Sequence, residues 1–114
     1  MSNQKIPSKH YQDLSKLFPE VMSALENLGT TIRGAGPIEG KITHLFQLAA
    51  AAALQSEGSV HSHARRAIQA GATPEEIYHV LLLLISTIGF PRVAAAVSWV
   101  QDIFSKGVKG DDLK

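Results

Sequence analysis

The sequence predicts an all-α protein, a bundle of five or six helices joined by short loops. Apolar residues recur at helical spacing along most of the chain, for example at Ile77, Leu81 and Leu84. Gly and Pro separate these segments, as at Gly34–Pro37 and Gly89–Pro91. No stretch shows the apolar and polar alternation of a half-buried strand.

Two helices are expected in the first third of the chain. Ser8 is a suitable N-cap for a short helix that ends near Leu17. The second helix begins at Pro19, because proline suits the first helical position and disfavours helical geometry in the residue before it. It ends at the glycine-rich segment that starts with Gly34.

The third expected helix runs from about Ile38–Gly40 to about Gln55 and is apolar on almost every side. Between Leu45 and Leu54 its only polar side chain is Gln47. Such a helix is normally buried on most faces, and a single chain of this length has little other structure with which to cover all of them. We therefore expect a homo-oligomer.

The second half of the chain is expected to add three helices. Ser59 is a plausible N-cap for a helix over Val60–Ala70. Thr73–Glu76 has the pattern of a capping box, with proline at the first position, and starts a helix over Pro74–Ile88. The last helix is expected over Pro91–Lys106.

Composition limits the classes of function. A length of 114 residues fits a single domain over 1–114, with flexible ends at 1–7 and 107–114. A net charge of +1 gives no argument for a nucleic-acid or membrane partner. The absence of cysteine excludes disulfides and thiol chemistry. The polar N-terminal sequence and the lack of a long apolar run lead us to expect a cytoplasmic location.

The candidate reactive groups gather around the turn between the third and fourth helices. Ser59 and His63 are four residues apart and so share a helix face. If the two helices form a hairpin, His44 can approach His63, and either imidazole can serve as a general acid or base near neutral pH. The alternative is a pair of partly buried histidines satisfied by backbone groups or water. Helix capping explains Ser59 better than nucleophilic catalysis does, because no nucleophile elbow surrounds it.

Other polar residues also have two interpretations. Arg65 either clamps a substrate carboxylate or lies with Arg66 on a solvated helix face. His61 lies on a different face from His63, so we expect it at the surface or at a subunit contact. A metal site built from these two histidines and His44 needs ligands from divergent directions, and no carboxylate is expected at ligand spacing beside them. We expect neither a metal nor a cofactor.

The segment His63–Ile77, followed by Val80–Leu82 and Gly89–Pro91, resembles the carboxymuconolactone decarboxylase family, which includes the alkyl hydroperoxidase D-like proteins. The resemblance covers about Pro19–Phe104. It implies an all-helical fold and ring-shaped homo-oligomers, often trimers or hexamers. This agrees with the expectation of subunit association from the apolar third helix.

The redox branch of this family carries a glutamate, then a Cys-x-x-Cys pair, then a histidine four residues later. The matching positions here are His44, then Ser56 and Ser59, then His63. A serine hydroxyl is barely ionised at neutral pH and forms no disulfide. Thiol peroxidase activity is therefore excluded.

The decarboxylase branch also lacks the cysteine pair and keeps a histidine followed by an arginine, which match His63 and Arg65. This resemblance implies a cofactor-free lyase that acts on a small carboxylated or lactone metabolite. The expected site has His63 and His44 as catalytic groups and Arg65, Ser59 and Ser56 as substrate-binding groups.

Leu83 and Thr87 stand where members of the family often place His or Gln and then Tyr. The wall of the expected site is therefore less polar than in either branch. This favours the alternative function, a non-catalytic oligomeric helical protein that binds an apolar ligand or serves as a scaffold.

Overall fold

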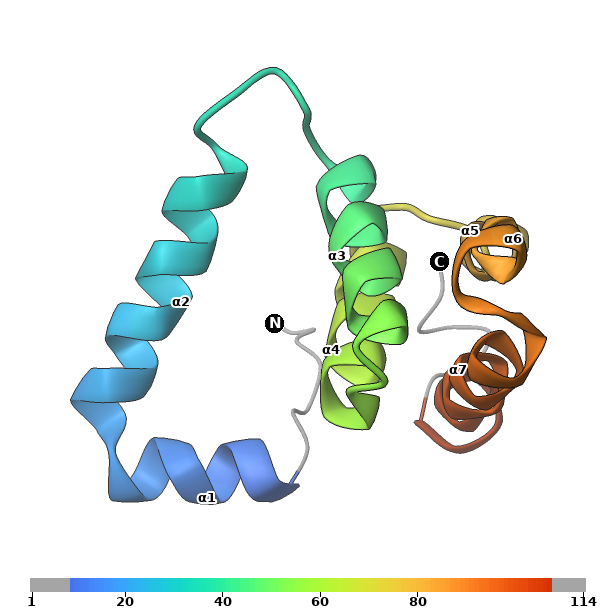
Figure 1. The fold of residues 1–114 in the computed structure, drawn as a ribbon. Helices are drawn as coiled ribbons and strands as arrows, with labels where there is room; N and C mark the ends of the chain where they lie inside the picture. The colour runs from blue at the N-terminus through green and yellow to red at the C-terminus, as the bar shows by residue number, and fades with distance from the viewer. Residues whose placement is uncertain (1–8, 108–114) are drawn as a thin grey trace. The chain divides into compact units, whose positions relative to one another are not determined.

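A computed structural model describes residues 9–107, and every regular element in that range is a helix, which confirms the all-α fold class (Figure 1). The helices are α1 (Lys9–Leu17), α2 (Pro19–Arg33), α3 (Lys41–Ala53), α4 (Glu57–Gln69), α5 (Pro74–Leu83), α6 (Ile85–Ile88) and α7 (Phe90–Asp102), followed by a π-helical turn, η1 (Ile103–Gly107). The chain forms two compact units, one ending at Glu39 and one beginning at Gly40. Within residues 9–107, no helix is long and apolar enough to cross a membrane.

The first unit contains α1 and α2. As expected, α2 begins at Pro19, and Phe18 before it has non-helical geometry, with φ of −136° and ψ of 64°. A hydrogen bond from the Tyr11 hydroxyl to the Glu26 carboxylate joins the two helices. The proposed cap of α1, Ser8, lies outside the described residues.

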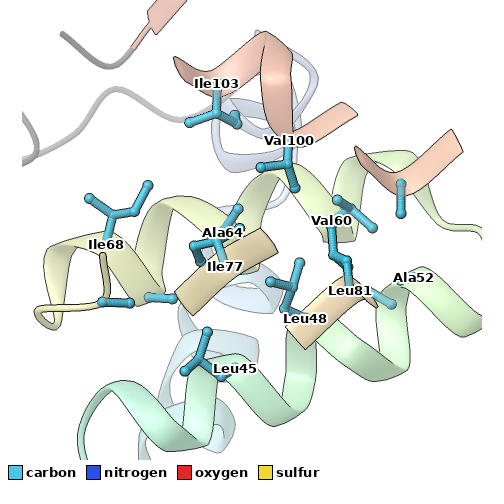
Figure 2. Packing of buried hydrophobic residues seen from close by; sticks show 14 of the residues in the cluster. Leu45, Leu48, Ala52, Val60, Ala64, Ile68, Ile77, Leu81, Val100 and Ile103 are labelled. Carbon is cyan, nitrogen blue, oxygen red and sulfur yellow. The ribbon is translucent and has the colours of Figure 1, made fainter. Parts of the chain in front are cut away.

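The second unit holds the hydrophobic core, in which a hairpin of α3 and α4 packs with α5 and α7 (Figure 2). The largest fully buried side chains come from all four helices: Leu48, Val60, Ile77, Leu81, Val93 and Val100. Alanines are also part of this core, and Ala52, Ala64 and Ala96 have no exposed surface. Small side chains at these positions let the helix axes come close together.

The fourth helix begins earlier than the sequence predicts. It starts at Glu57 rather than Val60, and its N-cap is Ser56, whose side chain makes no capping hydrogen bond. Ser59 therefore lies within the first turn, and its assignment as the N-cap is wrong. The backbone N–H of Val60 donates to the Ser56 carbonyl at 2.9 Å, as in any continuous α-helix.

The turn between α3 and α4 is stabilised by the side chain of Gln55. The third helix ends at Ala53, two residues before the predicted end, and Gln55 adopts a left-handed conformation with φ of 56°. Its amide Nε2 donates to the carbonyl of Ala52 at 2.8 Å and to that of Arg92 at 3.1 Å. This side chain thus ties the α3–α4 turn to the start of α7.

The predicted helix over Pro74–Ile88 is divided in the structure. The regular part, α5, ends at Leu83, and the N–H of Leu84 donates to the carbonyl of Leu81 at 3.0 Å. This three-residue bond is tighter than an α-helical one and interrupts the regular geometry before α6. The apolar pattern runs through the interruption, so the sequence carries no signal for it.

The last helix also differs from its prediction. It ends at Asp102 and continues as the π-helical turn Ile103–Gly107, rather than as an α-helix to Lys106. Of the flexible ends predicted at 1–7 and 107–114, Gly107 closes the π-helical turn, and all the other residues lie outside the described residues.

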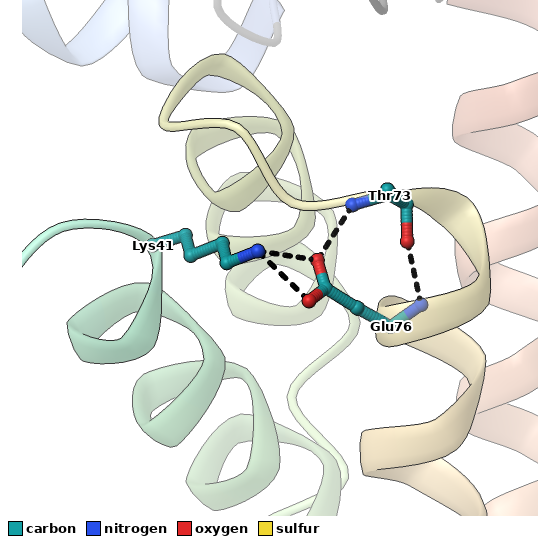
Figure 3. A network of polar contacts seen from close by, with 3 residues as sticks. All are labelled: Lys41, Thr73 and Glu76. Carbon is teal, nitrogen blue, oxygen red and sulfur yellow. Dashed lines mark hydrogen bonds and ion pairs between the residues drawn. The ribbon is translucent and has the colours of Figure 1, made fainter.

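The capping box at the start of α5 is confirmed (Figure 3). The Glu76 N–H donates to the Thr73 hydroxyl at 3.1 Å, and the Thr73 N–H donates to the Glu76 carboxylate at 2.9 Å. Lys41 Nζ adds hydrogen bonds of 2.9 and 2.8 Å to the same carboxylate. One carboxylate therefore joins the first turn of α3 to the first turn of α5.

Glu76→Gln should remove a pH-dependent part of the stability while retaining a capping side chain. The pKa of Glu76 is lowered, first by the hydrogen bond from Lys41 and then by that from the Thr73 backbone. Because the folded pKa lies below the unfolded one, this contribution is complete above about pH 4.3 and is lost as pH falls through the folded pKa. In denaturant unfolding, wild type should exceed the variant near neutral pH, and the difference should close in acid.

Glu75→Gln is the matched control, since Glu75 is an exposed carboxylate in the same helical turn. A pH profile shared by the two variants would contradict a specific role for the Lys41–Glu76 pair.

Candidate functional site

The hairpin of α3 and α4 brings His44 and His63 together. Their ring centroids are 6.4 Å apart and the ring planes are inclined by 35°. His44 lies in the first turn of α3 and His63 in the middle of α4, and both side chains are partly buried. The two rings are close enough for one small molecule to contact both.

Gln47 adds a buried acceptor near this pair, which the sequence interpretation treated only as a polar exception in an apolar helix. It lies three residues after His44 and so on the same face of α3. Its Oε1 is buried and accepts no hydrogen bond from any group in residues 9–107. An unsatisfied buried acceptor costs free energy, which a bound donor can recover.

The two serines lie at the entrance to α4. Ser56 is the N-cap residue, and Ser59 precedes His63 by one helical turn. Both are partly buried. A hydroxyl at these positions can donate or accept a hydrogen bond but cannot reproduce the redox chemistry of a cysteine pair.

The two consecutive arginines of α4 lie on different faces of the helix. An α-helix advances about 100° per residue, so His63 shares its face with Ser59 and Arg66, whereas Arg65 lies about 200° away. Arg65 instead lies one turn after His61 on the other face.

Arg65 is partly buried, and desolvation, followed by repulsion from Arg66, lowers its pKa. A guanidinium remains charged at neutral pH despite such a shift. No ion pair within residues 9–107 involves Arg65. Arg65 therefore forms no ion pair with Glu57, one of the nearest carboxylates along the chain, within residues 9–107.

A second group of polar residues lies on the His61 face. The expectation that no carboxylate stands at ligand spacing beside His61 is wrong, because Glu57 precedes it by one helical turn and Asp102 approaches it from α7. His61 Nε2 is 3.7 Å from Asp102 Oδ2. The four-residue spacing of Glu57 and His61 could have been read from the sequence; the approach of Asp102 depends on tertiary packing.

The fold and the site define an all-helical protein with two neighbouring histidines in a helical hairpin and no thiol at the adjoining turn. The chain belongs to the carboxymuconolactone decarboxylase family, whose sequence model matches residues 19–102. The resemblance noted from the sequence is therefore confirmed.

Two individual proteins resemble the chain along most of its length. It is 28% identical over 98 residues to an uncharacterized protein of Methanocaldococcus jannaschii, and the match covers 86% of this chain and 92% of that protein. It also resembles the crystal structure of an apo carboxymuconolactone decarboxylase family protein from Legionella pneumophila, with a TM-score of 0.67 and 24% identity. That likeness covers 81% of this chain and 82% of the other, and at this identity it concerns the fold alone.

Proposed function

We propose that the protein is a decarboxylase-like lyase that acts on a small carboxylated or lactone metabolite without a cofactor. The observation that carries this proposal is the His44–His63 pair, whose ring centroids are 6.4 Å apart. Two imidazoles at that distance can contact the same substrate and exchange protons with it near neutral pH.

In the proposed reaction, the bond between the carboxylate carbon and the substrate skeleton breaks, and carbon dioxide leaves. The bonding electron pair stays on the skeleton as a carbanion delocalised into an enolate. Protonated His63 then gives its proton to that carbon, and His44 orients the substrate or returns the proton.

The carboxylate clamp has two candidates on α4. Arg65 matches the family pattern and stays a prediction from that resemblance, whereas Arg66 shares a helix face with His63. Helix geometry favours Arg66 for a substrate that also contacts His63. A guanidinium holds a carboxylate through two parallel hydrogen bonds, which a glutamine cannot replace.

Turnover of 4-carboxymuconolactone, followed as release of carbon dioxide, tests the proposal directly. We expect Arg66→Gln to raise KM about 10- to 100-fold, the effect of losing a hydrogen bond to a charged group. Arg65→Gln is the matched variant, and we expect a smaller change. A larger increase in KM for Arg65→Gln would identify Arg65, the residue that matches the family pattern, as the carboxylate clamp.

A wild-type protein that releases no carbon dioxide from this lactone or from related carboxylated lactones would contradict the lyase proposal. It would favour the non-catalytic alternative. One observation supports that alternative: Leu83 and Thr87, at positions often polar or aromatic in the family, are both exposed. Leu83 retains 62% of its surface. Exposed leucines suit an apolar ligand or a protein contact.

We also propose that the protein is a homo-oligomer, a trimer or a hexamer. The supporting observation is a set of apolar side chains on α3 and at its C-cap that the other helices of the second unit leave uncovered. It includes Ile42, Phe46 and Leu54, with exposures of 42%, 59% and 79%. Large exposed apolar surfaces on one helix are typical of subunit interfaces. The cytoplasmic location stays a prediction from the sequence.

A further inference from the structure

Three metal-ligating side chains meet where α4 packs against α7, on a helix face that the histidine pair does not use. Glu57, His61 and Asp102 each place a ligand atom within 4.8 Å of the other two. We infer that these residues form a binding site for a divalent transition-metal ion of the zinc type. This inference is independent of the proposed lyase activity.

The two helices hold the ligands on rigid backbone. Glu57 and His61 are four residues apart on α4, so their side chains extend from one face. Asp102 is the last residue of α7. The residues beside the ligands anchor both helices, since Val60 and Val100 have no exposed surface and Ile103 keeps only 6%.

The set of donors suits a zinc-type ion. One imidazole nitrogen and two carboxylate oxygens make three protein ligands, and solvent can complete a four-coordinate site. Two carboxylates balance the charge of a divalent ion, although Arg65, one turn after His61 on this face, adds one positive charge.

The distances are close to those that a metal ion needs. Bonds of 2.0–2.2 Å in a tetrahedral site separate neighbouring ligand atoms by about 3.3–3.6 Å. His61 Nε2 and Asp102 Oδ2 are already 3.7 Å apart. Glu57 is exposed, so its side chain can rotate to complete the site without disturbing the core.

The nitrogen of His61 provides a second and separate argument. His61 Nε2 is buried and makes no hydrogen bond to any residue in the described part of the chain. Its separation from the Asp102 oxygen is too long for a hydrogen bond. Coordination of a cation between the two groups satisfies both the nitrogen lone pair and the carboxylate.

Titration of the chelator-treated, untagged full chain with Co²⁺ tests the site. We expect one ion per chain, with the visible bands of a tetrahedral Co²⁺ complex, and displacement of the Co²⁺ by Zn²⁺. His61→Ala and Asp102→Asn should each weaken binding by at least about tenfold.

His79→Ala is the matched control, because His79 is an exposed histidine outside the cluster, and it should bind Co²⁺ like wild type. Circular dichroism checks that each variant folds, and Asp102→Asn carries the test if His61→Ala does not. The inference is overturned if wild type binds no ion, or if His61→Ala and Asp102→Asn bind it unchanged. Equal loss of binding in His79→Ala would overturn it as well.

Discussion

Replacement of His63 by asparagine is expected to lower kcat for 4-carboxymuconolactone by about 10²- to 10⁴-fold, the usual effect of removing a general acid or base. His63 is the histidine that lies between Ser59 and Arg66 on its helix face, and its ring is 6.4 Å from that of His44. Asparagine keeps polarity and much of the volume but cannot transfer a proton at neutral pH. The loss should therefore appear mainly in kcat rather than in KM.

Two companion variants sharpen this test. His79→Asn removes an exposed histidine on α5 and should leave turnover unchanged. His44→Asn should lower kcat, and its effect combined with His63→Asn should be less than multiplicative, since the two rings serve one reaction. Full turnover by the His63 variant, with its fold verified by circular dichroism, would show that His63 is not the proton donor.

Replacement of Phe46 by lysine is expected to reduce the particle mass from that of a trimer or hexamer to that of a single chain. Phe46 keeps 59% of its surface exposed and follows Ile42 by one turn on the same face of α3. A lysine at the centre of an apolar contact would place a charge where water is excluded. Light scattering coupled to size-exclusion chromatography measures the mass directly.

Gln69→Lys is the control, because it adds the same charge at an exposed polar position at the end of α4. Its mass should match wild type. A wild-type protein that is monomeric at micromolar concentration would rule out the oligomer proposal. An oligomeric Phe46→Lys variant would place the subunit contact elsewhere.

Local sequence signals predicted local structure well. The capping box of Thr73 and Glu76 forms as expected, because all its groups lie within one helical turn. Pro19 likewise starts α2 for reasons contained in the residue itself. Where several residues can do the same task, sequence alone did not choose correctly: Ser56 and Ser59 are both good N-cap residues, and the helix uses the earlier one.

Features that depend on contacts between helices were less accessible. The hydrogen bond from Gln55 to the carbonyl of Arg92 forms only when α7 is packed in place, so no sequence pattern predicts it. The same applies to Asp102, which approaches His61 only because α7 packs on α4. The approach of His44 to His63 was conditional on a hairpin, and the structure supplies that hairpin.

The carboxylate of Glu76 has a consequence for local opening of the fold. It serves the cap of α5 and the ammonium of Lys41 at once, and His44 lies three residues after Lys41. Amide protons in the first turns of α3 and α5 should therefore exchange with solvent together, as one cooperative unit. Protonation of Glu76 should then make the first turn of α3, which holds His44, open more often. The order of that turn therefore depends on a residue of α5.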